Sequence, residues 1–194
     1  SLRIYTMLIA VAGSQGSGKS TLINKLENLG YKTITRKTSR SILSDWNVTL
    51  SQVNNDRDLT VKFQDEILKR KLEDESVALG SSDVWFTERT FADLFTYTCV
   101  AIGKDNEYNE WMNGYYERCV DAQKIYKQVV YLQGGLFPIQ PDGVRAINPH
   151  YSRMVDMFMK QYTKEISQTY NEIDFVDMMQ RVRFIEECIQ NATK

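Results

Sequence analysis

Apolar residues follow two patterns that alternate along the chain. Short, mostly apolar runs at residues 7–12, 84–87 and 129–132 are typical of strands that are buried on both faces of a parallel sheet. Residues 31–35 and 173–176 fit two shorter strands. Between these runs, apolar residues recur at three- and four-residue spacing among charged residues, which predicts amphipathic helices. We place these helices at residues 20–29, 58–77, 90–102, 107–126, 150–170 and 178–189.

This alternation of strands and helices predicts an α/β fold. The expected architecture is one mostly parallel, five-stranded sheet flanked by helices, with right-handed crossovers. In such sheets a ligand binds outside the carboxyl ends of the strands. With 194 residues, of which 42% are hydrophobic, the chain has the material for one core, so we treat residues 1–194 as a single domain.

The composition narrows the range of partners and compartments. Lys and Arg number 24 and Asp and Glu number 25, so the net charge offers no general attraction to nucleic acid, and any contact with DNA must be local. No apolar run approaches the roughly 18 residues that a membrane span needs, so we expect a soluble cytoplasmic protein. Cys99, Cys119 and Cys188 are widely spaced and odd in number, and we expect structural thiols.

The first apolar run ends in a glycine-rich turn with the pattern GxxxxGK[ST]. Glycines let successive backbone N–H groups turn inward around a phosphate, and the N-terminus of the following helix adds positive potential. By position, Lys19 would reach the β and γ phosphates, Ser20 would bind Mg²⁺, and Thr21 would reach toward the α phosphate. This P-loop predicts ATP and Mg²⁺ as ligands, because the sequence lacks the Asn-Lys-x-Asp guanine reader of GTPases. The predicted ATP-binding residues are Gly13, Ser14, Gln15, Gly16, Ser17, Gly18, Lys19, Ser20 and Thr21.

A second cluster of candidate residues follows the predicted strand at 84–87. Glu88 and Arg89 emerge together at the end of this strand. An acid there can hold the magnesium shell or accept a proton, and the guanidinium beside it can bind a phosphate through two hydrogen bonds. Asp93 and Tyr97 lie four residues apart, and therefore on one face of the next helix. The alternative is a surface ion pair followed by ordinary helix packing.

A basic segment follows the second predicted strand. Residues 35–40 read Thr-Arg-Lys-Thr-Ser-Arg, a density of cations and hydroxyls that suits a bound phosphate group. The candidate ligands are Arg36, Lys37 and Arg40. A solvated basic turn is the alternative.

A long loop is predicted in the second half of the chain. Residues 133–149 hold three glycines and all three prolines and show no helical period. Such segments often carry function, and we predict a lid at about residues 133–150, which contains Arg145. A mobile surface loop is the alternative.

Over most of its length, the chain resembles a group of compact P-loop kinases that are common in bacteriophages. The resemblance rests on the P-loop, on Thr87-Glu88-Arg89 with Asp93, and on Asp142-Gly143-Val144-Arg145. Only the P-loop is highly specific by itself. The resemblance implies catalytic roles for Lys19, Glu88, Arg89 and Arg145, metal binding by Ser20 and Glu88, and acceptor binding by Arg36, Lys37, Arg40, Asp93 and Tyr97.

The activity that the resemblance implies is transfer of the γ-phosphoryl group of ATP to a nucleotide-class acceptor, a deoxynucleoside monophosphate. Nucleoside kinases that attack through a sugar hydroxyl usually carry a carboxylate near residues 35–40. This chain has none there until Asp45, which favours an acceptor that already bears a phosphate. Related enzymes phosphorylate the hydroxymethyl group of 5-hydroxymethylpyrimidines, such as 5-hydroxymethyluracil, in DNA, and this alternative stays open. A P-loop ATPase that acts on a partner or on DNA is the alternative from another class.

Overall fold

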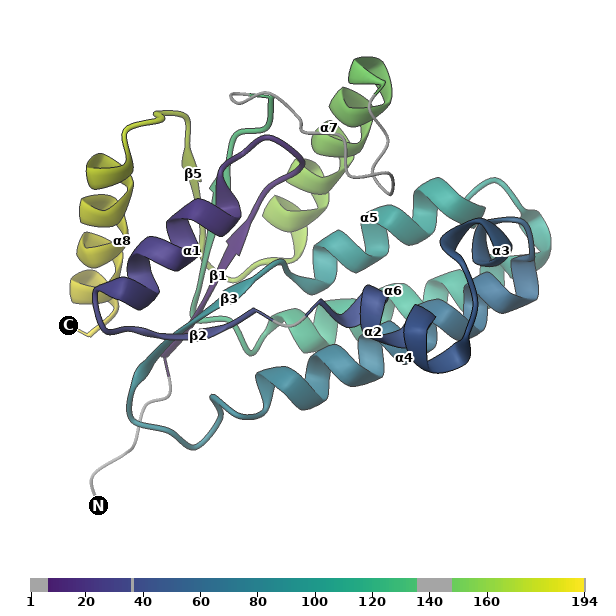
Figure 1. Cartoon of the computed structure of the whole chain (residues 1–194), viewed down its shortest axis with the longest axis horizontal. Helices are drawn as coiled ribbons and strands as arrows, with labels where there is room; N and C mark the ends of the chain where they lie inside the picture. The colour runs from purple at the N-terminus through teal and green to yellow at the C-terminus, as the bar shows by residue number, and fades with distance from the viewer. Residues whose placement is uncertain (1–6, 36, 136–147, 194) are drawn as a thin grey trace.

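The computed structural model describes residues 7–35, 37–135 and 148–193. Within these ranges, five strands form one sheet in the order β2-β3-β1-β4-β5 (Figure 1). The strands are β1 (Met7–Ala12), β2 (Lys32–Ile34), β3 (Val84–Glu88), β4 (Gln128–Leu132) and β5 (Tyr170–Ile173). Every pairing in this sheet is parallel, which confirms the predicted α/β architecture. Because β3 and β4 flank β1, the carboxyl end of β1 lies between the ends of both neighbours.

Helices cover both faces of the sheet (Figure 1). They are α5 (Phe91–Ile102), α6 (Asn109–Gln123) and α7 (Pro149–Ile166) on one face, and α1 (Lys19–Asn28) and α8 (Met178–Ala192) on the other. Alternate residues of β1 pack into the two cores that these helices form with the sheet. This double burial is why β1 reads as an unbroken apolar run. Within the described ranges, no helix is both long and apolar enough to cross a membrane.

A group of three helices extends the protein beside α5 (Figure 1). These are α2 (Thr38–Trp46), α3 (Leu50–Asn54) and α4 (Arg57–Glu75), which pack around a third core built on Ile42, Val53, Phe63 and Ile67. The sequence analysis missed α2 and α3, because α3 has only five residues and α2 fully buries only Ile42. Neither helix therefore produces a long apolar period. The capping box of Thr49 and Gln52 was the available signal for α3.

The fifth strand was predicted three residues too late. It spans Tyr170–Ile173 rather than 173–176, and α7 ends at Ile166 rather than at residue 170. Among the described residues β5 pairs only with β4, at the edge of the sheet, and of its four residues only Ile173 is buried. An edge strand needs no continuous apolar run, so the apolar pair at 175–176 misled the prediction. That pair instead leads into α8.

The helix that follows the predicted lid begins earlier than the sequence suggested. Asn148 is the N-cap of α7 and accepts a hydrogen bond from the backbone N–H of His150, at 2.9 Å. Pro149 occupies the first turn of the helix, where its missing N–H costs nothing. Residues 149 and 150 are therefore helical. Residues 136–147, including Arg145, lie outside the described part of the chain.

Candidate active site

The P-loop is a tight turn between β1 and α1 whose conformation depends on glycine. Gly13, Gly16 and Gly18 have φ values of 146°, 73° and 86°, which side chains with a Cβ rarely adopt. A Cβ on Gly13 would lie 2.6 Å from the carbonyl oxygen of Leu132. α1 starts at Lys19 without a side-chain cap and without an acidic residue in its first turn. The N–H groups at this end of α1 are thus suited to bind an anion.

Lys19 lies over this turn. Its Nζ donates hydrogen bonds to the backbone carbonyl oxygens of Gly13 and, at 3.2 Å, Ser14. The side chain of Ser14 donates to Asp156 Oδ1 at 2.8 Å, and Tyr131 OH donates to the same oxygen at 2.6 Å. Asp156 lies on α7, so this carboxylate joins the P-loop to the helix that follows the predicted lid. Sequence reasoning missed Asp156, because no motif marks it.

Ser20 in the first turn of α1 lies beside Glu88 at the end of β3. β1 and β3 pair directly, with Val11 opposite Glu88, so the acid at the end of β3 lies beside the start of α1. Ser20 Oγ donates a hydrogen bond to Glu88 Oε1 at 3.2 Å. A hydroxyl and a carboxylate are hard oxygen ligands of the kind that Mg²⁺ prefers. The two predicted metal ligands are therefore adjacent.

These two residues also suit a metal that is shared with a nucleotide. No group of three or more His, Cys, Asp or Glu residues that could hold a metal occurs in the described ranges. Mg²⁺ at phosphate sites is usually bound by one or two protein oxygens together with phosphate oxygens and water. Ser20 and Glu88 fit that kind of site.

Arg89 has an unusual backbone conformation for a residue with a side chain. Its φ is 74°, in the left-handed region, which costs roughly 1–2 kcal/mol for a non-glycine residue. Its N–H donates to the carbonyl oxygen of Val11 at 2.9 Å, which holds the turn against β1. The side chain is exposed. Such local backbone strain is concentrated at functional sites. No sequence pattern predicts the left-handed conformation of Arg89.

Asp93 is buried behind this turn, with 1% relative exposure. Thr90 is the N-cap of α5: its hydroxyl accepts from the N–H of Ala92 at 3.2 Å and donates to Asp93 Oδ1 at 3.3 Å. Burial raises the pKa of Asp93, and the charges of Lys19, Arg89 and Lys71 act in the opposite direction. The P-loop lysine and Asp93 therefore share one electrostatic environment. Tyr97, one turn further along α5, is half-buried and packs against the core.

The basic segment of the prediction lies at the same edge of the sheet. β2 pairs with β3, and α2 follows it with Lys37 as its N-cap residue and Arg40 in its first turn. Both side chains are exposed. The first turn of α2 has no acidic residue and no side-chain cap, so it adds positive potential. Arg36 lies outside the described residues.

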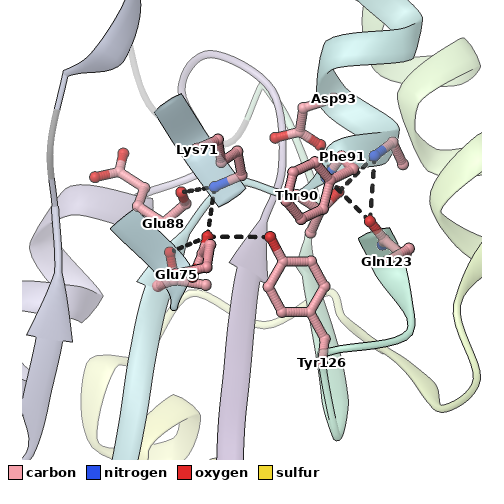
Figure 2. A network of polar contacts seen from close by, with 10 residues as sticks. Lys71, Glu75, Glu88, Thr90, Phe91, Asp93, Gln123 and Tyr126 are labelled. Atoms are coloured by element: carbon pink, nitrogen blue, oxygen red, sulfur yellow. Dashed lines mark hydrogen bonds and ion pairs between the residues drawn. The ribbon is translucent and has the colours of Figure 1, made fainter. Parts of the chain in front are cut away.

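Three further buried charged residues near the site carry no sequence motif. Arg181 on α8 has 0% exposure and donates to the carbonyl oxygens of Ser17 and Phe175, both at 2.8 Å. It supports the P-loop from behind, and burial lowers its pKa. Lys71 and Glu75 on α4 lie beneath the end of β3 (Figure 2). Their spacing of four residues was the only signal in the sequence.

With this geometry established, the chain can be compared with known proteins. A family model described as an AAA domain matches residues 8–181. The chain belongs to this AAA-domain family. The fold of this AAA domain is a P-loop NTPase fold, as predicted. A comparison with curated protein sequences finds no match.

Solved structures with the same fold include two kinases and the NadR protein. Deoxyadenosine kinase from M. mycoides with bound dCTP has a TM-score of 0.66 and 16% identity, over 95% of this chain and 100% of that chain. Shikimate kinase from Acinetobacter baumannii in complex with shikimate has a TM-score of 0.55 and 13% identity, over 97% and 95% of the two chains. The NadR protein in complex with NR has a TM-score of 0.65 and 11% identity over 88% of this chain, which spans only 46% of the NadR chain. At these identities the likeness concerns the fold alone.

Proposed function

We propose that this AAA-domain protein is an ATP-dependent kinase that transfers the γ-phosphoryl group to a nucleotide-class acceptor, with a deoxynucleoside monophosphate as the expected acceptor. The observation that carries the proposal is the convergence of the P-loop lysine with two carboxylates. Glu88 contacts the first turn of α1, and Asp93 is buried within the electrostatic reach of Lys19. Asp93 is thus a second acid close to the P-loop lysine, where it could help to orient an acceptor. The end-to-end fold similarity to deoxyadenosine kinase supports the kinase reaction but does not bear on the choice between a nucleoside and a monophosphate acceptor.

The position of each residue indicates its role in phosphoryl transfer. Lys19 would offset the charge of the transferred phosphoryl group, and Ser20 and Glu88 would hold Mg²⁺. When bound, this metal ion would neutralise phosphate charge. Arg89 is exposed next to Glu88 and would bind the acceptor or the transferred group through its guanidinium. Asp93 would orient the acceptor.

An acceptor phosphate would be bound by the basic start of α2. Lys37, Arg40 and the N-terminal N–H groups of this helix provide positive potential, and Arg36 belongs to the same segment. In this scheme the predicted lid, with Arg145, would cover the phosphates and exclude water. The roles of Arg36, Arg145 and Tyr97 stay predictions.

The burial of Asp93 favours a second candidate function. A carboxyl group with a raised pKa is suited to accept a proton, and an alcohol acceptor needs such a base whereas a phosphate acceptor does not. The hydroxymethyl group of a 5-hydroxymethylpyrimidine in DNA is an acceptor of this kind. In that reaction the alcohol oxygen attacks the γ phosphorus, its proton passes to Asp93 or Glu88, and ADP leaves.

The experiment is transfer of radiolabelled γ-phosphate from ATP with Mg²⁺, in parallel reactions. The acceptors are the four deoxynucleoside monophosphates, DNA with 5-hydroxymethylpyrimidines, unmodified DNA, and no acceptor. Label on a free monophosphate supports the first proposal, and label only on modified DNA supports the second. Rapid release of phosphate without any acceptor would identify an ATPase instead. Lys19→Ala should nearly abolish transfer, and full activity in that variant would refute the assignment of the site.

A further inference from the structure

A buried ion pair on α4 lies beneath the carboxyl end of β3 (Figure 2). Lys71 and Glu75 are one helical turn apart, with relative exposures of 8% and 0%. Lys71 Nζ lies 2.7 Å from Glu75 Oε1. Moving two charges out of water is costly, and apolar residues of similar size often stabilise a protein at least as well as a buried pair. Stability alone therefore does not explain why charges occupy these positions.

Glu75 connects the pair to the sheet. Its Oε1 accepts hydrogen bonds from Thr87 Oγ1 at 2.8 Å and from Tyr126 OH at 3.1 Å. Thr87 belongs to β3 and directly precedes Glu88, and Tyr126 lies just before β4. Burial and then the charge of Glu75 raise the pKa of Tyr126, so its hydroxyl remains a donor. Glu75 is thus fixed relative to both strands that flank β1.

Lys71 extends from this fixed point toward the candidate active site (Figure 2). Its Nζ lies 3.5 Å from the backbone carbonyl oxygen of Glu88 and 5.5 Å from the ring centroid of Phe91. The charge of Lys71 also acts on Asp93, whose pKa it lowers against the larger effect of burial. The ammonium group therefore lies under the backbone turn that carries Glu88, Arg89 and Asp93.

Gln123 holds the other side of the same turn (Figure 2). Its Oε1 accepts from the N–H groups of Phe91 at 3.0 Å and Ala92 at 3.3 Å. Between these two supports lies Arg89 with its left-handed φ of 74°. A strained residue keeps its conformation only when the surrounding structure restrains it. Lys71 and Gln123 are positioned to supply that restraint.

We propose that the Lys71–Glu75 pair is a positioning device, which fixes the backbone from residue 88 to residue 92 and thereby places Glu88, Arg89 and Asp93 for phosphoryl transfer. The catalytic consequence rests on the kinase activity proposed above. The fixing of the backbone can be measured without any activity, so the two proposals can fail separately.

The test uses the full chain with Lys71→Met and Glu75→Gln combined, so that neither charge is left buried alone and the glutamine amide oxygen can still accept from Thr87 and Tyr126. The matched control is Arg118→Met with Asp65→Leu, because that ion pair also involves α4, with an Arg118 Nη2 to Asp65 Oδ1 distance of 2.5 Å, and joins α4 to α6 rather than to the turn after β3. Four quantities are measured in wild type and both variants. They are kcat and KM for ATP, the unfolding midpoint, and amide hydrogen exchange at Arg89, Phe91 and Ala92.

The positioning role predicts a fall in kcat of about 10- to 100-fold, with KM for ATP changed by less than about threefold. It also predicts about tenfold or greater loss of protection at the three amides, while the amides of α1 and the control variant keep wild-type values. Unchanged kcat and protection in the folded double variant would overturn the proposal. So would a loss that affects kcat, KM and the unfolding midpoint together, which indicates a general structural role. If wild type transfers phosphate to no acceptor, the kinase proposal fails, and hydrogen exchange alone decides whether the pair fixes the turn.

Discussion

Replacing Gly13 by alanine would place a methyl group where the phosphate turn has no room. The new Cβ would lie 2.6 Å from the carbonyl oxygen of Leu132, and 2.9 Å from Ser17 Oγ. Carbon and carbonyl oxygen ordinarily meet at about 3.3 Å or more, so the contact with Leu132 is about 0.7 Å too short. The serine side chain can rotate, but Leu132 belongs to β4, which pairs with β1 and β5, so its carbonyl group cannot move freely. The P-loop must therefore shift.

Two costs add in this variant. Overpacking in a well-packed region costs about 1–3 kcal/mol, and a φ of 146° in a residue with a Cβ adds roughly 1–3 kcal/mol. We expect Gly13→Ala to lower the free energy of unfolding by about 2–6 kcal/mol, or to relieve the strain by displacing the loop, with at least about tenfold weaker ATP binding. Denaturant unfolding and a nucleotide-binding titration measure both quantities.

The matched control is Gly114→Ala, because Gly114 is an exposed glycine within α6 and a Cβ there would meet nothing within 4 Å. This control should gain about 0.5–1 kcal/mol from its better helix propensity and bind ATP as wild type does. If Gly13→Ala matched wild type in both its unfolding midpoint and its ATP affinity, the geometry assigned to the turn would be wrong.

Three further predictions concern buried and paired groups. Tyr126→Phe should cost about 1–3 kcal/mol of unfolding free energy, because the buried carboxylate of Glu75 loses a donor; a variant as stable as wild type would contradict that bond. Lys32 holds the pKa of Asp83 below its ordinary 3.8 through a hydrogen bond and its charge, so this carboxylate stabilises the fold above that pH and less as pH falls through the lowered pKa. Asp83→Asn should therefore be less stable than wild type near neutrality and equal to it in strong acid, and a stability gap independent of pH would argue against the pairing. Burial raises the pKa of Cys119 to about 12, so iodoacetamide should alkylate it at pH 8 only after unfolding, as mass spectrometry would detect; alkylation in the native protein at the unfolded rate would contradict its burial.

The parts of the fold that the sequence predicted well are those where burial leaves little choice of residue. β1, β3 and β4 each have parallel neighbours on both sides, and β1 and β4 are buried throughout, so their sequences are nearly continuous apolar runs. β5 and α2 lie at the margins of the structure and bury only part of their surface. Their sequences are correspondingly mixed. Periodicity could not place β5 correctly or detect α2 at all.

The candidate site likewise contains residues that the sequence could indicate and residues that it could not. The P-loop and the pair of Glu88 and Arg89 were accessible from the sequence, because each follows directly from the end of a recognisable strand. Asp156 could not be found, since its contact with Ser14 joins residues 142 positions apart. The positive φ of Arg89 and the burial of Lys71 are likewise properties of the assembled structure. Sequence patterns report what one element needs, whereas these features depend on how several elements meet.

The balance of charge at the strand ends explains why the site must draw on groups beyond β1 and β3. Lys19 and Arg89 are matched in number by Glu88 and Asp93, and the charge of Lys71 is already opposed by Glu75 at 2.7 Å. A triphosphate would add several negative charges to this nearly neutral group, and an acceptor phosphate would add more. Preorganised positive charge stabilises phosphoryl transfer. The additional positive charge must therefore come from groups other than those at the ends of β1 and β3. A metal ion held by Ser20 and Glu88 would supply part of it, and the basic start of α2, at the same edge of the sheet, would supply the rest. The two acids at the end of β3 are compatible with phosphate binding only because these two sources of positive charge would lie close by.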